Sequence, residues 1–136
     1  MKTYFLDTSA LVKRYHQEVG TDISDKIFGE EDKELFISDL SIIEFHSAIA
    51  LKVRTREISR DAFFHLIGLF SNELDIGLYQ VMRIDEAEKQ EAVKLLAKYG
   101  FDYALRTLDG LQLAAMESVG KEKVDWVVAR IQDFAR

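Results

Sequence analysis

Residues 4–15 read YFLDTSALVKRY, and this stretch places one acid between a strand-like and a helix-like segment. The apolar run within residues 3–7 is too short for a helix and therefore predicts a buried strand. A helical pattern follows it, for which Thr8 or Ser9 can supply the N-cap. Asp7 thus stands where a strand ends, which is where open parallel α/β sheets bind ligands. Taken alone, Asp7 is equally well explained as a cap of the following helix.

The rest of the chain alternates between strand and helix patterns. Apolar or alternating runs predict further strands at residues 34–38, 78–84 and 124–129. Helical patterns with cap residues or terminal glycines are found at residues 19–28, 39–57, 59–74, 85–100 and 105–120. This alternation predicts an α/β fold, in which helices cover both faces of a parallel sheet.

Composition fits one ordinary domain that spans residues 1–136. The chain is 48% hydrophobic and 31% charged, without a Pro-rich linker or an internal repeat. It has no cysteine, which excludes disulfides and thiolate metal sites and suits the reducing cytosol. We expect a cytoplasmic protein, because neither a membrane span nor a secretory signal is evident. The net charge of −6 means that a nucleic-acid partner would need a local basic patch.

Two further acids repeat the placement of Asp7. Glu44 lies near the start of a helix after the second predicted strand, on a face that it shares with Leu40 and Ala48. A carboxylate on an apolar face is costly unless it has a partner. Asp109 opens the apolar helix LRTLDGLQLAAM at residues 105–116. Each acid also has a plainer interpretation, since Glu44 can reach solvent at an edge and Asp109 can satisfy the helix dipole.

Together, the three acids predict a metal site. Carboxylates that converge without a partner repel one another, and Mg²⁺ or Mn²⁺ removes that cost through oxygen coordination. Such an ion can polarise a phosphate and activate water for attack. Other motifs are lacking: the sequence has no glycine-rich phosphate loop, its three histidines lack metal-binding spacing, and Ser9 has no evident base.

The same segments carry a family resemblance. YFLDTSALVK, SIIEFHSAIA and LRTLDGLQLAAM resemble, in order and spacing, the acidic motifs of PIN-domain ribonucleases, and most of all those of VapC-type toxins. The resemblance implies a three-layer α/β/α sandwich and an endoribonuclease that depends on Mg²⁺ or Mn²⁺ and is neutralised by a small antitoxin. It also implies that Asp7, Glu44 and Asp109 are catalytic metal ligands, supported by Thr8 and Ser9 from outside the coordination sphere.

The sequence departs from the family near its end. Where the family has an acid in a pattern such as VTAD, residues 127–130 read VVAR, so Arg130 replaces the expected acid. Asp133 is a possible substitute. The change puts a second metal ion in doubt, and three consequences stay open: weaker catalysis, neutralisation of the acidic pocket, or contact between Arg130 and RNA phosphate. Lys13 and Arg14 are further candidates for RNA contact.

The leading hypothesis is therefore a metal-dependent ribonuclease that acts as the toxin of a type II toxin–antitoxin pair. The alternatives are a catalytically weakened PIN-like module that binds nucleic acid or protein, and a metal-dependent DNA nuclease. The helix at residues 59–74 is apolar on more than one face, which predicts a core position or a subunit interface. We accordingly expect a homodimer or an antitoxin-binding groove.

Overall fold

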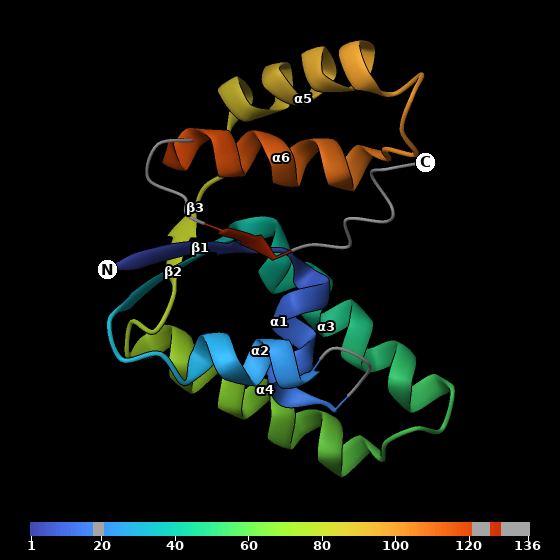
Figure 1. Cartoon of the computed structure of the whole chain (residues 1–136). Coiled ribbons are helices and arrows are strands. Elements are labelled where there is room, and N and C mark those ends of the chain that lie inside the picture. Colours follow the sequence, from blue (N-terminus) through green and yellow to red (C-terminus); the bar gives the residue numbers. More distant parts are fainter. Residues whose placement is uncertain (18–20, 121–125, 129–136) are drawn as a thin grey trace.

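A four-stranded parallel sheet lies at the centre of the computed structural model, which describes residues 1–17, 21–120 and 126–128 (Figure 1). The strand order is β3-β2-β1-β4. The strands are β1 (Lys2–Leu6), β2 (Lys33–Ser38), β3 (Gln80–Met82) and β4 (Trp126–Val128). The predicted central parallel sheet is thus confirmed, and β1 is one of its two inner strands.

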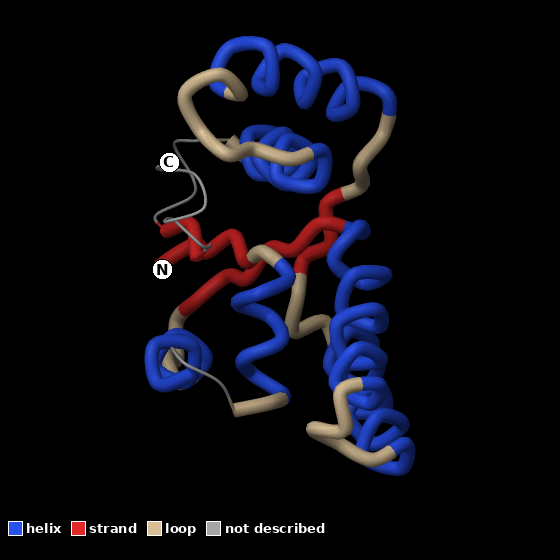
Figure 2. Tube along the Cα trace, turned by 90° about the vertical axis from the view of Figure 1, so that its right-hand side faces the viewer, coloured by secondary structure: helices blue, strands red, loops and turns tan. Residues whose placement is uncertain are grey.

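Helices cover both faces of this sheet, so the chain is a three-layer α/β/α sandwich (Figures 1 and 2). One layer contains α1 (Thr8–Tyr15), α2 (Thr21–Phe28), α3 (Asp39–Arg54) and α4 (Arg60–Asp75). The other contains α5 (Glu86–Tyr99) and α6 (Thr107–Val119), which pack side by side as a hairpin. Within the described ranges, no helix is both long and apolar enough to cross a bilayer.

Alternation along β1 divides the core into two parts. Successive side chains of a strand point to opposite faces of the sheet. Tyr4 and Leu6 belong to the larger cluster with α1, α3 and α4, whereas Phe5 packs with Ala115 and Val119 of α6. All three β1 side chains are buried, as expected of a strand that is covered on both faces.

The apolar helix α4 is only partly used by this core. Phe70 is fully buried, and Phe63 and Leu66 pack against the core from its border. Phe64 and Leu69 are exposed at 70% and 43%. The helix therefore has one face in the core and a second apolar face that is open in this structure.

Candidate active site

The three predicted acids follow elements that meet at the carboxyl edge of the sheet. Asp7 comes directly after β1, and Glu44 lies in the second turn of α3, which begins where β2 ends. The helix α6 leads back to the start of the parallel strand β4, so its first turn, with Asp109, belongs to the same edge. The topology thus places all three acids on the side where parallel sheets bind ligands.

Asp7 itself is the N-cap of α1. Its Oδ1 accepts a hydrogen bond of 2.9 Å from the backbone N–H of Ala10. The prediction that Thr8 or Ser9 caps this helix is therefore wrong. The reason is that Asp7 has the extended backbone of a cap, whereas the hydroxyl of Thr8 is used elsewhere. A hydrogen bond from one backbone N–H does not by itself prevent the carboxylate from having a second role.

Thr8 and Glu44 are at the centre of a hydrogen-bond network. Thr8 Oγ1 donates to Glu44 Oε1 at 2.8 Å and lies 3.2 Å from the hydroxyl oxygen of Ser41. Gln112 Nε2 donates to the same Glu44 oxygen at 3.0 Å and to Ser41 Oγ at 2.9 Å. The network joins α1, α3 and α6 beside Asp7. Glu44 thus accepts hydrogen bonds from two neutral donors. These bonds offset the free-energy cost of placing a carboxylate among apolar neighbours.

Gln112 is the residue of this network that sequence reasoning missed. It is 9% exposed, and its Oε1 has no hydrogen-bond partner among the described residues. The sequence does contain a sign of its role: Gln112 is an amide in the otherwise apolar run GLQLAAM, one helical turn after Asp109. A buried polar side chain normally has a specific partner, so such a position identifies a candidate contact.

Asp109 is turned back on the start of its own helix. Its Oδ2 accepts a hydrogen bond of 2.9 Å from the backbone N–H of Arg106. In the part of the chain that the structure describes, no three His, Cys, Asp or Glu side chains lie close enough together to hold a metal ion. The three-acid metal site therefore stays a prediction.

The residues around Glu44 nevertheless suit a hard divalent cation in their chemistry. The possible metal ligands at this edge are carboxylate, hydroxyl and amide oxygens, which Mg²⁺ and Mn²⁺ prefer. Gln112 Oε1 is a further buried oxygen, without a hydrogen-bond partner among the described residues. In such a site, Asp7 and Glu44 could serve as ligands, and Asp109 could do so only by giving up its hydrogen bond to Arg106 N–H.

Arg14, a candidate for RNA contact, is half-buried and pairs with Glu73 of α4. Its Nε donates to Glu73 Oε1 at 3.0 Å, its Nη2 pairs with Glu73 Oε2, and its guanidinium lies 4.3 Å from the ring centre of Phe28. Hydrogen bonding to Glu73 holds the pKa of Arg14 above its ordinary value, against the effect of burial. The charge of Arg14 is paired within the protein in this structure, and its contact with RNA stays a prediction.

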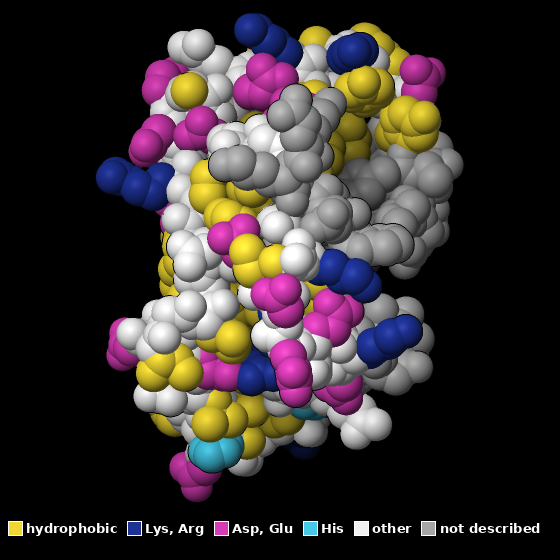
Figure 3. All heavy atoms as spheres, turned by 60° about the vertical axis from the view of Figure 1, so that its left-hand side comes forward, with side chains coloured by type: hydrophobic (Ala, Val, Ile, Leu, Met, Phe, Trp, Pro, Cys, Tyr) yellow, Lys and Arg dark blue, Asp and Glu magenta, His cyan; other side chains and the backbone are white. Residues whose placement is uncertain are grey.

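Four candidates from the sequence remain: Ser9, Lys13, Arg130 and Asp133. Ser9 and Lys13 are half-buried in α1. Arg130 and Asp133 lie outside the described residues, so their roles stay predictions. Figure 3 shows the side of the molecule on which the strands begin, and acidic and basic side chains are interspersed there without a continuous basic patch among the described atoms.

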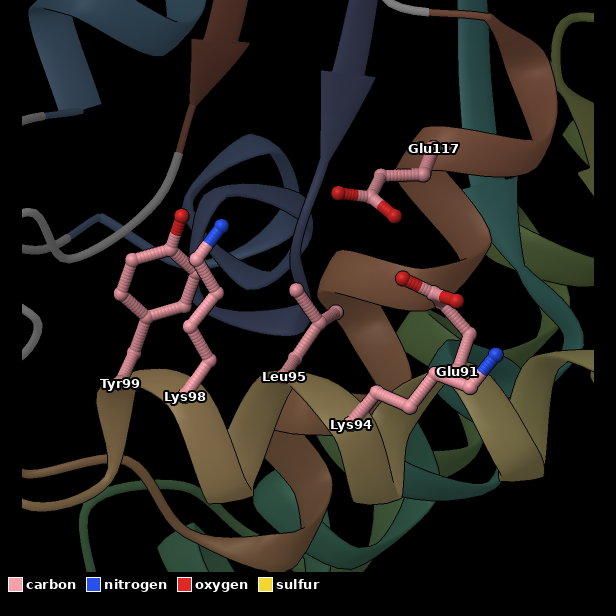
Figure 4. A pocket seen from close by; sticks show the side chains of 6 residues that line it. All are labelled: Glu91, Lys94, Leu95, Lys98, Tyr99 and Glu117. Carbon is pink, nitrogen blue, oxygen red and sulfur yellow. The ribbon is translucent and has the colours of Figure 1, made fainter.

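A pocket of about 450 Å³ lies on the α5–α6 hairpin, apart from the residues of the network (Figure 4). Its walls mix cationic, anionic and apolar side chains: Glu91, Lys94, Leu95, Lys98, Tyr99 and Glu117. Two lysines and two glutamates line it, so no strong field of one sign is expected in the pocket. The pocket therefore adds no catalytic group to the site at the sheet edge.

Comparison with known proteins agrees with this architecture. The sequence model of the PIN domain family matches residues 4–127. The crystal structure of VapC20 from Mycobacterium tuberculosis, a toxin that cleaves the sarcin–ricin loop, is similar with a TM-score of 0.68 and 13% identity, over 93% of this chain and 88% of that one. A toxin–antitoxin complex from Klebsiella pneumoniae is similar with a TM-score of 0.62 and 14% identity, over 97% of this chain and 90% of that one. No curated protein matches the chain in sequence.

Proposed function

Because the chain belongs to the PIN domain family, we propose that it is a metal-dependent endoribonuclease and the toxin of a type II toxin–antitoxin pair. The observation that carries the proposal is the hydrogen-bonded Glu44, held by Thr8 directly beside Asp7 at the carboxyl edge. Similar structures include a toxin that cleaves the sarcin–ricin loop and a toxin–antitoxin complex, which supports both RNA as the substrate class and an antitoxin as the partner.

The chain's own residues have distinct parts in this proposal. Asp7, Glu44 and Asp109 would hold Mg²⁺ or Mn²⁺, whose chemistry here is to polarise a phosphodiester and to activate water. Thr8 donates to Glu44 and so fixes one of its oxygens. Asp7 is fixed by the first turn of α1. A carboxylate near the attacking water assists in removing its proton.

A second candidate is a weakened PIN-like module that binds nucleic acid or protein without cleaving it. One observation favours it: Asp109 is used as a helix cap, and no three-acid cluster forms among the described residues. The replacement of the family's later acid by Arg130 points in the same direction. The two candidates differ in whether the folded protein binds a divalent ion and turns over RNA.

A side-by-side nuclease assay distinguishes these functions. Labelled RNA and DNA of the same sequence are incubated with the protein in Mg²⁺, in Mn²⁺ and with a chelator. The ribonuclease proposal expects cleavage of RNA alone, dependent on metal and lost in Glu44→Gln. Cleavage of DNA instead identifies a DNA nuclease. Binding of RNA without cleavage in either metal supports the weakened module and overturns the enzyme.

A further inference from the structure

Gln112 connects the two helical layers at the candidate site. It belongs to α6, whereas both of its hydrogen-bond acceptors, Ser41 Oγ and Glu44 Oε1, belong to α3 on the other side of the sheet (Figure 1). Its side chain is 9% exposed, so these bonds form away from bulk solvent. A buried amide that donates one hydrogen bond to each of two neighbours restricts how these two side chains can move.

The amide can adopt only one orientation here. Turned by 180°, Gln112 would bring its own oxygen 3.0 Å from Glu44 Oε1, so that two acceptors would face each other without a hydrogen between them. The amide nitrogen must therefore face the carboxylate. This leaves Oε1 of Gln112 on the far side, where it has no partner among the described residues.

The number of available hydrogens shows which oxygen of Glu44 accepts the hydrogen bonds of the network. A hydroxyl has one hydrogen, and that of Thr8 lies in the shorter contact, at 2.8 Å, with Glu44 Oε1. The hydrogen of Ser41 then fits the 3.2 Å contact between the two hydroxyls. Glu44 Oε1 thus accepts from both Thr8 and Gln112, and no hydrogen bond to Oε2 is found among the described residues.

We propose that Gln112 is a positioning residue that acts through Glu44: it clamps Oε1 and leaves Oε2 as the oxygen that binds the divalent ion. The inference rests on the proposed metal-dependent function. It makes ion affinity depend on the docking of α6, because the clamp is lost when that helix shifts. Partners that orient a metal ligand from outside the coordination sphere typically change affinity or activity by about 10- to 100-fold.

The test measures Mn²⁺ affinity by titration calorimetry, well below the melting temperature of each folded variant. Gln112→Met keeps the length and bulk of the side chain but removes both donors, and it should weaken Mn²⁺ binding by about 10- to 100-fold. Gln112→Asn withdraws the amide by one methylene and should act in the same direction. Gln90→Met, the same change at an exposed position of α5, should bind Mn²⁺ as the wild type does.

A purely structural role for Gln112 predicts a different pattern. It lowers the melting temperature of Gln112→Met and leaves the Mn²⁺ affinity of the folded protein unchanged, and that result overturns the inference.

NMR of the wild type gives a second measurement, which needs no substitution of Gln112. The side-chain amide signals of Gln112 should shift when Mg²⁺ saturates the protein, and constant signals contradict the clamp. A wild type that binds neither ion overturns the metal-dependent function itself, and the inference with it.

Discussion

Thr8 Oγ1 lies 2.8 Å from Glu44 Oε1, and this hydrogen bond spans 36 positions of the sequence. It joins the first turn of α1 to the second turn of α3, beside the cap residue Asp7. The bond places a donor against the acid that the proposed function needs most. The contribution of this hydrogen bond to stability and activity can be separated from that of side-chain packing, because valine has nearly the shape of threonine but lacks the hydroxyl.

Thr8→Val should reduce both stability and activity. A hydrogen bond to a charged group is worth about 1.5–3 kcal/mol, so we expect a loss of that order in urea denaturation. Ribonuclease activity should fall by about 10- to 100-fold, because Glu44 loses one of its two positioning donors. Thr8→Ser keeps the hydroxyl and should stay near the wild type in both measurements. Equal activity in the valine and serine variants would show that the hydroxyl has no role in the site.

The strand and helix order was predictable from the sequence because periodicity and caps were both clear. Helix ends were less so: the pattern predicts a helix to residue 57, yet α3 ends at Arg54. The chain turns at Arg56, whose φ of 64° is a left-handed value that usually signals glycine. Glu57 N–H bonds the carbonyl of Lys52, as in a Schellman cap. An arginine at this position gives no sequence signal for a stop.

The sequence indicated three candidate acids but not the hydrogen-bond network around Glu44. Asp7, Glu44 and Asp109 were chosen for their placement after strands or at helix starts, and their convergence on one metal ion stays a prediction. Ser41 and Gln112 were not, since a hydrogen bond between residues 71 positions apart depends on how α6 docks against α3. The engagement of Arg14 with Glu73 was hidden for the same reason, because 59 positions separate them. Local pattern predicts elements, and tertiary packing decides which side chains meet.

Metal binding should depend on Asp109 although it caps α6 in this structure. An ion at 100 times its dissociation constant adds about 2.7 kcal/mol to the free energy of unfolding. Asp109→Asn keeps an oxygen that can accept from Arg106 N–H, so the cap survives while the charged ligand is lost. We expect most of the Mg²⁺- or Mn²⁺-dependent rise in melting temperature to disappear in this variant.

Asp61→Asn is the matched control, because Asp61 is an exposed acid in the first turn of α4. It should respond to both ions as the wild type does. An equal metal response in Asp109→Asn and the wild type would exclude Asp109 as a ligand.

Two glycines of the α4 region should respond to alanine in opposite directions. Gly68 is exposed within α4, and an added Cβ would meet nothing within 4 Å, so Gly68→Ala should stabilise the protein by about 1 kcal/mol. Gly77 has a φ of 80° and follows the C-cap Ile76, so Gly77→Ala should destabilise it by about 1–2 kcal/mol through backbone strain. Denaturant unfolding measures both changes. Shifts of the same sign would show that strain at Gly77 does not decide the result.

The open apolar face of α4 should govern self-association. Phe64 is 70% exposed there, and we expect a homodimer in light scattering that Phe64→Ser converts towards monomer. Phe101, 92% exposed near the turn after α5, provides a control of equal chemistry at another place. If Phe101→Ser dissociates the dimer and Phe64→Ser does not, the interface lies on the α5–α6 hairpin. A wild type that is monomeric at all concentrations excludes both surfaces.

The ion pair between Arg14 and Glu73 should make stability depend on pH in the acid range. Burial alone would raise the pKa of Glu73, but hydrogen bonds from Arg14 and Tyr15 and the charge of Arg14 outweigh it and hold that pKa below its ordinary value of 4.5. A carboxyl with a lowered pKa in the folded state stabilises the protein fully above the ordinary value. This contribution is lost as pH falls from the ordinary value through the lowered one.

Glu73→Gln should therefore destabilise the protein most at neutral pH, by about 1.5–3 kcal/mol, and progressively less as the medium becomes acidic. The reason is that protonation of Glu73 in the wild type removes the same charge that the substitution removes. Urea denaturation of both proteins between about pH 7 and pH 3 measures the difference. Glu31→Gln, an exposed acid after α2, should leave the pH profile unchanged. A gap between Glu73→Gln and the wild type that stays constant down to the acid end would show that Glu73 does not titrate with folding in this range, and that the pair contributes through packing against Phe28 instead.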